Sequence, residues 1–357
     1  MNKIKFILTL LICVLTAGCN MNASAPSTPD LFATLQASTP PNVSAPQVTQ
    51  VVTTPVFNFA TVTLTSVSSS AQTSIPSPSS SDQPSGHIAY TCQVFRDQGT
   101  EQICIMNADG SGFRRLTTEN NIRHFYPSLS PDGRSVLYSA YLVDNNYEVY
   151  RLDLNDGSLD KLTNLIGVDN APEISPDGQQ LVFMHNSPTK NTYQIMTADR
   201  NGGSAGNISG INGWDPTWSP DGKQILFASD KNGTNQLYTV KLDGSKLTKI
   251  TNLPAIRGRS DWSPDGNYIV TYSGEAWHRE LYIMNADGTN VHQLTPSGGN
   301  SQGPSFSPDG KWVAFTAYFD HYNDDNGCEI YIIRIDGTDL RRLTNNDYCD
   351  YQPRWGP

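Results

Sequence analysis

Short apolar runs recur along the chain from residue 86 onward, and each is bounded by glycine, proline, asparagine or aspartate. In these runs apolar side chains follow one another without alternation, which is typical of strands covered on both faces. The clearest runs are 136–138, 181–183, 225–227, 269–270 and 312–315. The hydrophobic pattern therefore predicts a protein of short, buried strands.

The tetrapeptide Ser-Pro-Asp-Gly precedes each of these runs. Serine first, proline second and glycine fourth are the preferences of a type I β-turn, so each copy joins two strands. A repeat period of this size indicates one supersecondary unit per copy. The five copies are 44 or 45 residues apart and begin at Ser130, Ser175, Ser219, Ser263 and Ser307.

Each unit continues with a third apolar run, a turn that is mostly Asp-Gly, and a fourth segment that mostly ends in Leu-Thr. Four antiparallel strands per unit predict a propeller blade. An open solenoid is the alternative, but it needs capping repeats. The unit 86–117 lacks a first strand and residues 351–355 supply one. We therefore expect an all-β fold, a six-bladed β-propeller of four-stranded antiparallel blades, with the first blade closed by the C-terminal strand.

The segments 281–288 (Leu-Tyr-Ile-Met-Asn-Ala-Asp-Gly) and 307–315 (Ser-Pro-Asp-Gly-Lys-Trp-Val-Ala-Phe) resemble the WD-like repeat of TolB-type propellers. The resemblance covers about residues 86–357. Departures are local: Asn201-Gly202-Gly203 replaces one Asp-Gly turn, and Ser260 stands where the other units have proline. TolB-type proteins carry an α/β domain ahead of the propeller, and prolyl-oligopeptidase-like enzymes carry a hydrolase domain after it; neither is expected here.

The N-terminus has the pattern of a bacterial lipoprotein signal. Lys3 and Lys5 precede an apolar run that is shorter than a membrane span and ends in Leu-Thr-Ala-Gly before Cys19. This predicts a signal peptide over 1–18 and lipid attached to Cys19. Residues 19–85 are rich in serine, threonine and proline and predict a disordered tether. Residues 86–357 are the expected propeller.

The formal charge of −10, without basic clusters, argues against nucleic-acid binding. Four cysteines remain beside Cys13 in the signal and Cys19, and an even set in an exported chain favours disulfides. The predicted blade geometry pairs Cys92 with Cys104, and Cys328 with Cys349.

Binding residues are expected on the longer loops, which lie at the opposite end of the blades from the Ser-Pro-Asp-Gly turns. Aromatic and arginine side chains there are of the types that dominate binding. The alternative is that several of them only satisfy backbone groups of the loops or pair with each other. The candidates are Arg123, His124, Asp169, Asn170, Trp214, Asp215, Arg257, Arg259, Gln302, Asp350 and Tyr351.

One first-strand position carries Glu173, Asp261 and Arg354 in different units, near the expected channel. We expect Arg354 to neutralise one of the two carboxylates, rather than the carboxylates to act as a general acid and base. The loop 320–327 contains Asp320, Asp324 and Asp325, which are oxygen ligands of the kind calcium uses, but it lacks the full spacing and favours a solvated hairpin tip. Residues 202–206 match Gly-x-Ser-x-Gly without its strand-to-helix context and predict a turn.

These patterns favour a monomeric, lipid-anchored propeller in the bacterial cell envelope or periplasm, outside the cytoplasm. It would bind a protein or peptide without catalysis and without a cofactor. The alternative is a propeller that binds or cleaves glycans, with acidic residues in the channel or with Trp214 and Tyr351 as sugar-stacking rings. Fold alone does not choose between these functions.

Overall fold

The computed structural model describes residues 83–94, 101–119, 121–143, 146–189, 192–256, 258–320, 324 and 327–357. All of them belong to one compact unit, Ala71–Pro357. Within these ranges every regular element is a β-strand. Likewise, the described part of the chain contains no helix with the length and apolar composition needed to traverse a bilayer.

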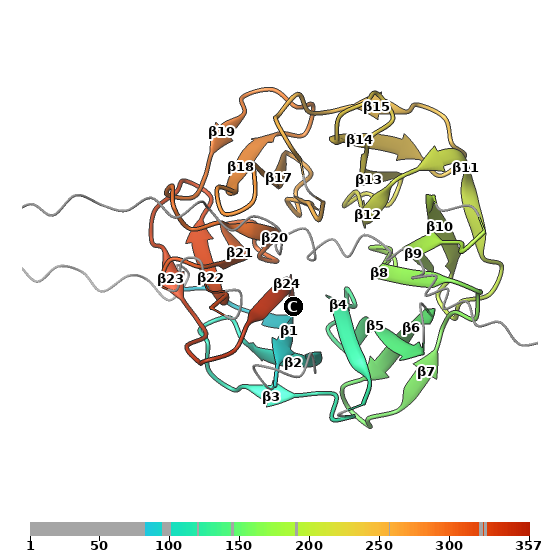
Figure 1. Ribbon diagram of the computed structural model, residues 1–357, viewed down its shortest axis with the longest axis horizontal. Helices are drawn as coiled ribbons and strands as arrows, with labels where there is room; N and C mark the ends of the chain where they lie inside the picture. The colour runs from blue at the N-terminus through green and yellow to red at the C-terminus, as the bar shows by residue number, and fades with distance from the viewer. Residues whose placement is uncertain are drawn as a thin grey trace, which may run out of the picture. The chain divides into compact units, whose positions relative to one another are not determined.

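The strands form antiparallel four-stranded sheets arranged in a ring (Figure 1). The ring-closing sheet has the order β24-β1-β2-β3, so the last strand of the chain pairs with the first. Its strands are β1 (His87–Gln93), β2 (Glu101–Asn107), β3 (Arg114–Arg115) and β24 (Asp350–Gly356). The prediction of an all-β propeller built from antiparallel four-stranded sheets is confirmed.

The next eight strands form one sheet instead of two separate ones. A single parallel bridge between Tyr147 and Val168 joins a β4–β7 half to a β8–β11 half. The first half contains β4 (Arg123–Leu129), β5 (Ser135–Val143), β6 (Asn146–Asp153) and β7 (Leu159–Lys161). The second contains β8 (Val168–Ile174), β9 (Gln180–Asn186), β10 (Tyr193–Asp199) and β11 (Gly206–Asn212).

Three further sheets of four strands complete the ring. The β12–β15 sheet contains β12 (Trp214–Trp218), β13 (Gln224–Ser229), β14 (Gln236–Lys241) and β15 (Thr248–Lys249). The β16–β19 sheet contains β16 (Asp261–Trp262), β17 (Tyr268–Ser273), β18 (Glu280–Asn285) and β19 (His292–Gln293). The β20–β23 sheet contains β20 (Gln302–Phe306), β21 (Trp312–Ala317), β22 (Glu329–Arg334) and β23 (Arg341–Arg342). Strand β16 is the shortest first strand, at the unit where Ser260 replaces proline.

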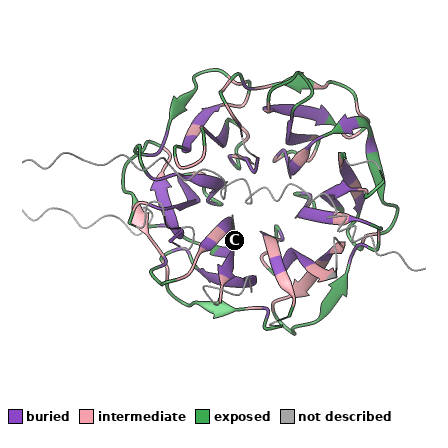
Figure 2. Ribbon diagram, in the orientation of Figure 1, coloured by how far each residue is buried: buried purple, intermediate pink, exposed green. Residues whose placement is uncertain are grey.

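The hydrophobic core lies between neighbouring sheets. One cluster joins Ile88 of the ring-closing sheet to Trp312 of the β20–β23 sheet, and another joins Ala89 to Val136 on the other side. The remaining clusters join the successive sheets pairwise. Figure 2 shows the same layout, with buried inner strands and exposed outer strands such as β3 and β7. Each sheet is therefore stabilised by contact with both neighbours.

The Ser-Pro-Asp-Gly segments form the predicted turns. In each of the five, the glycine N–H donates to the carbonyl of the serine at 2.8 or 2.9 Å. The serine Oγ also donates to the aspartate at 2.6 or 2.7 Å. The serine and the aspartate thus stabilise the turn by hydrogen bonds within the tetrapeptide itself, which explains why this tetrapeptide recurs.

The Leu-Thr endings have a similar explanation. The Thr295 hydroxyl accepts the N–H of Leu281 at 3.0 Å and donates to Glu280 at 2.7 Å. Equivalent contacts of Thr163 use Val149 and Glu148. In more than one sheet, therefore, the threonine that follows the fourth strand is hydrogen-bonded to the start of the third strand.

Both predicted disulfides are confirmed. Cys92 of β1 is bonded to Cys104 of β2, and Cys328, just before β22, is bonded to Cys349, just before β24. Both bonds therefore involve segments at or beside the ring-closing sheet.

Candidate functional site

The first strand of each unit lies innermost in the ring (Figure 1), and equivalent positions at and just before these strands define two layers. Five of the six first strands end at a Ser-Pro-Asp-Gly turn, and the sixth is β24, so residues earlier in these strands lie nearer the loops. We call the two layers the turn-side ring and the loop-side ring. The turn-side ring is Ser128, Glu173, Thr217, Asp261, Ser305 and Arg354; the loop-side ring is Tyr126, Ala171, Asp215, Arg259, Gly303 and Gln352.

Arg354 of β24 crosses the turn-side ring. Its guanidinium lies 3.3 Å from a carboxylate oxygen of Asp261 and 3.7 Å from one of Glu173, which belong to two different sheets. Arg354 is 5% exposed. Burial raises the pKa of Glu173, and the charge of Arg354 opposes that shift. The centre is therefore closed at this level by one arginine shared between two acids.

The same two carboxylates link neighbouring first strands. Glu173 accepts the Thr217 hydroxyl at 3.1 Å and the Trp218 N–H at 3.3 Å. In the same way, Asp261 accepts the Ser305 hydroxyl at 3.0 Å and the N–H of the next residue at 2.9 Å. The carboxylates of this layer therefore have a structural role in addition to their ion pairs with Arg354.

The loop-side ring contains Asp215 and Arg259, both buried. Burial raises the pKa of Asp215 to about 6, against the opposing charges of Arg259 and Arg354. Burial, followed by the like charge of Arg354, lowers the pKa of Arg259 to about 9. These shifts indicate that the two side chains lie in a poorly solvated centre.

Arg259 and Asp215 keep polar atoms without a protein partner. One Arg259 nitrogen, Nη2, donates to the carbonyl of Pro127 at 2.8 Å, and the guanidinium lies 5.7 Å from the centre of the Tyr126 ring. The other terminal nitrogen, Nη1, and Oδ1 of Asp215 have no hydrogen-bond partner among the described residues. A buried polar atom of this kind needs water or a ligand.

The loop-side ring has an unusual backbone that the sequence did not reveal. Five of its six positions have positive φ, namely Tyr126 (55°), Ala171 (51°), Asp215 (52°), Gly303 (59°) and Gln352 (55°). Four of these residues are not glycine, so the conformation is strained, and strain of this kind concentrates at functional sites. The strand register shifts at these positions in β4, β8, β12 and β20. A bulge before a proline, repeated in most units, is the signal that was missed.

Four predicted loop residues are engaged in pairs within the chain. These pairs tie the residues to neighbouring parts of the chain, although Oδ2 of Asp169 has no hydrogen-bond partner among the described residues. The pairs are Arg123 with Glu101 (2.6 and 2.9 Å), Asp169 with His185 (2.6 Å), Gln302 with Arg279 (2.7 Å) and Asp350 with Asn346 (2.8 Å). Burial raises the pKa of Asp350 to about 7, with nearby Glu329 adding to the shift.

The remaining loop candidates are mostly covered. His124 is buried against the Tyr138 ring, and burial lowers its pKa. Asn170 is buried and Trp214 packs on the core between the β12–β15 and β16–β19 sheets. Tyr351 is half-buried. Arg257 lies outside the described residues, as do Cys19 and Asp325.

The calcium candidate Asp320 is engaged by the protein: its carboxylate accepts Tyr331 Oη at 2.8 Å and Arg342 Nη1 at 2.7 Å. Within the described ranges no three His, Cys, Asp or Glu side chains gather as a metal site. The predicted candidates that meet in one place are thus Asp215, Arg259, Glu173, Asp261 and Arg354, at the centre of the ring.

The TolB beta propeller domain family matches residues 85–278, more than half of the chain. This chain belongs to the TolB β-propeller family. It is 27% identical to the Tol-Pal system protein TolB of Francisella tularensis, over 42% of this chain and 46% of the relative. It is 32% identical to an uncharacterized protein of Agrobacterium fabrum, over 37% and 44% of the two chains. The matches thus span about half the length of these curated relatives.

Solved structures agree on the TolB-like fold. TolB from Acinetobacter baumannii superposes with a TM-score of 0.66 at 23% identity, covering 76% of this chain and 67% of the other. A putative TolB from Agrobacterium tumefaciens gives 0.57 at 21% identity, covering 76% and 99%. At these identities the likeness concerns the fold alone.

Proposed function

We propose that this TolB-family chain is a non-catalytic scaffold that binds a protein or peptide partner at the loop side of its ring. The observation that carries the proposal is the pair of unpartnered atoms on Asp215 and Arg259, one acceptor and one donor, in a layer of strained backbone. A polypeptide offers both an N–H and a carbonyl to such a pair. The name of the Francisella relative, a Tol-Pal system protein, agrees with a role in a multiprotein system.

The centre has room for a partner group on the loop side. A Cβ placed on Gly303 would meet no atom within 4 Å, and Ala171, the ring position beside Asp215, carries only a methyl group. On the turn side, by contrast, Arg354 and its two acids fill the same axis. A bound segment would therefore enter from the loops and end above Arg354.

The domain layout is part of the proposal: residues 1–18 a signal peptide, 19–85 a tether and 86–357 the propeller. We count the eight-stranded sheet as two blades, which gives six in all; the core clusters on both sides of each half support this count. Lipid on Cys19 would hold the propeller, as a monomer, outside the cytoplasm. The two disulfides support an oxidising compartment.

Partner capture tests the site. The full chain is crosslinked in native envelopes as wild type and as Asp215→Asn, Arg259→Gln and Asp156→Asn, the last a control whose carboxylate lies on an exposed turn. We expect partner recovery to fall at least about tenfold for the two ring variants, as for a truncated buried polar contact, and to persist for the control. Equal recovery from all four proteins would contradict the site, provided that the melting curves agree.

Lipid attachment is tested separately with a labelled lipid precursor. Label should enter the wild-type chain and be lost in Cys19→Ser. Label that persists in the variant would remove the anchor from the proposal while leaving the binding site untouched.

One observation favours a second function. Asp215 and Glu173 are acids with raised pKa values at one centre, which is the arrangement of a general acid in glycan hydrolysis or elimination. Glycan cleavage by the purified chain that is lost in Asp215→Asn, without a captured protein partner, would replace the scaffold with an enzyme.

A further inference from the structure

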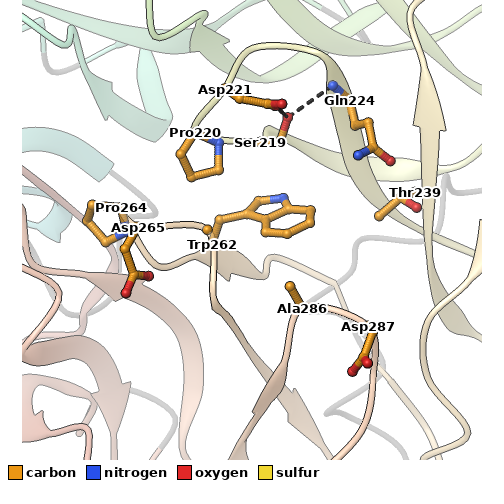
Figure 3. A pocket seen from close by; sticks show the side chains of 11 residues that line it. Ser219, Pro220, Asp221, Gln224, Thr239, Trp262, Pro264, Asp265, Ala286 and Asp287 are labelled. Atoms are coloured by element: carbon orange, nitrogen blue, oxygen red, sulfur yellow. Dashed lines mark hydrogen bonds between the residues drawn. The ribbon is translucent and has the colours of Figure 1, made fainter.

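A cleft of about 640 Å³ opens between the β12–β15 and β16–β19 sheets, on the turn side of the ring (Figure 3). It lies at the opposite end of the blades from the site proposed above, because its walls are Ser-Pro-Asp-Gly and Asp-Gly turns. Figure 3 shows the indole of Trp262 lying across the cleft between Pro220 and Ala286.

Trp262 differs from the tryptophan at the equivalent position of the preceding unit. Trp218 is 3% exposed, and its indole N–H donates to the carbonyl of Glu173 at 3.3 Å. Trp262, 44 residues later, is only half-buried, and its indole nitrogen has no hydrogen-bond partner among the described residues. The same residue type in the same strand position therefore serves the core in one unit and borders a cleft in the next.

The turns also separate at this place. At two other junctions a turn proline approaches the turn glycine of the next unit: a Cβ on Gly222 would lie 3.8 Å from Pro176, and one on Gly310 would lie 3.5 Å from Pro264. A Cβ on Gly266 would meet nothing within 4 Å, so Pro220 does not approach it in this way. Gly178 is equally free of neighbours, so what distinguishes this junction is the combination of the open turn with the half-buried Trp262 in the lining of the cleft.

The rim of the cleft is acidic. Hydrogen bonds from Ser219, Ser263 and Thr289 lower the pKa values of Asp221, Asp265 and Asp287, in that order, so all three carboxylates are charged at neutral pH. The exposed ammonium of Lys223 lies 3.2 Å from Asp221 and shows that a cation fits at this rim. Asp287 receives its hydrogen bonds on Oδ1 alone among the bonds described.

The chain already combines tryptophan and cations in this way elsewhere. The guanidinium groups of Arg334 and Arg341 lie 4.3 and 4.8 Å from the centre of the Trp312 ring. There the cations come from the same sheet. In the cleft the described lining offers an indole, prolines and carboxylates, but no lysine or arginine.

We propose that this cleft binds a lysine or arginine side chain from a basic segment of a partner polypeptide. The aliphatic stem of that side chain would lie against Pro220 and Trp262, and its charged end would lie over the indole and between Asp265 and Asp287. This contact is independent of the loop-side site and would give the propeller a second partner surface.

Fluorescence anisotropy tests the proposal with the full chain in detergent and a fluorescein-labelled Gly-Lys-Gly-Lys-Gly peptide. The control is the same peptide with both lysine side chains acetylated, which keeps their aliphatic chains and removes their positive charges. We expect the lysine peptide to bind about tenfold more tightly than the acetylated one, with affinity falling as salt is added. Equal affinities, or no binding of either peptide at millimolar protein, would overturn the proposal.

Variants locate the binding. Trp262→Leu removes the ring but keeps apolar bulk and should weaken lysine-peptide binding about fivefold. Asp287→Asn should weaken it about threefold. Asp336→Asn is the matched control, because Asp336 receives the same two hydrogen bonds from Thr338 that Asp287 receives from Thr289, on a turn outside the cleft. A loss as large in the control as in Asp287→Asn, or an unchanged Trp262→Leu, would place the peptide elsewhere.

Discussion

Acidic residues at the turns and at the centre of this ring experience opposite environments. At the turns, Asp132 and Asp265 each receive the hydroxyl of the serine in their own tetrapeptide and the N–H of the residue that follows it, and these bonds lower the pKa of both carboxyls. At the centre, burial raises the pKa of Asp215 and Glu173, and the opposing charges belong to other sheets.

This difference separates two kinds of interaction. Some are formed within one repeat, and others form only when the ring closes and brings different sheets together. A turn aspartate finds its partners two residues away, so the same sequence works five times. Glu173 is compensated by Arg354, which comes from the last strand of the chain. The repeated positions therefore build the fold, and the positions that break the repeat carry the charges at the centre of the ring.

The largest test of this comparison removes the shared arginine. Arg354→Met removes the buried counter-charge from the half-buried Glu173 and Asp261, so we expect the free energy of unfolding to fall by about 3 kcal/mol. Urea denaturation followed by circular dichroism measures this loss. Adding Glu173→Gln to Arg354→Met should recover part of it, because one uncompensated charge is then removed; no recovery would mean that the arginine acts by packing alone.

The second test concerns the disulfide between Cys328 and Cys349, which lies beside the ring-closing strand β24. Replacing Cys328 and Cys349 by alanine opens a crosslink across a sequence separation of 21 residues, and we expect a loss of about 3 kcal/mol in the free energy of unfolding. Denaturant midpoints of wild type and double variant give the value. Reductant should then cost the wild type more than the variant, because the variant keeps only the Cys92–Cys104 bond; an equal loss in both proteins would assign the effect to Cys92–Cys104.

The third test compares the pH dependence of the two environments. The raised pKa of Asp350, about 7 against 3.8, means that the folded state holds its proton more tightly than the unfolded state. Its contribution to stability is therefore present below about pH 4 and is lost as pH rises through 7. Asp350→Asn should be more stable than wild type by about 2 kcal/mol at pH 8, with the difference vanishing near pH 4.

Asp132→Asn is the counterpart at a turn and should behave with the opposite sign. The pKa of Asp132 is lower in the folded state than in the unfolded chain. The ionised carboxylate therefore stabilises the folded state at pH values above the unfolded pKa, and this contribution is lost as pH falls through the folded pKa. The variant should therefore be less stable than wild type at pH 7 and approach it in acid. The same sign for both variants would remove the distinction between turn and buried carboxylates.

The sequence predicted the parts of the molecule that depend on local chemistry. The Ser-Pro-Asp-Gly turns, the four-stranded sheets and both disulfides followed from spacing, because each involves neighbours within a unit or at its ends. The bridge between Tyr147 and Val168 that merges two sheets did not follow, because it joins strands of different units.

The candidate site was predicted only in part. Equivalent strand positions brought Glu173, Asp261 and Arg354 together in advance. Neither the unpartnered atoms of Asp215 and Arg259 nor the unpartnered indole nitrogen of the half-buried Trp262 follows from the sequence, because each depends on what a neighbouring unit fails to provide. A repeat pattern reports what its members share, and these features are differences between members.

The smallest expected effect tests whether the turns are independent of one another. The Ser263 hydroxyl donates to Asp265 at 2.6 Å and accepts the N–H of Tyr268 at 2.8 Å, so Ser263→Ala should cost about 1 kcal/mol of unfolding free energy. Ser130→Ala breaks the equivalent bonds in another unit and should cost the same. Because each turn is closed by its own residues, the double variant should lose the sum of the two within about 0.5 kcal/mol, measured by urea denaturation. A loss clearly larger or smaller than the sum would mean that the turns are coupled around the ring, as the charges at its centre are.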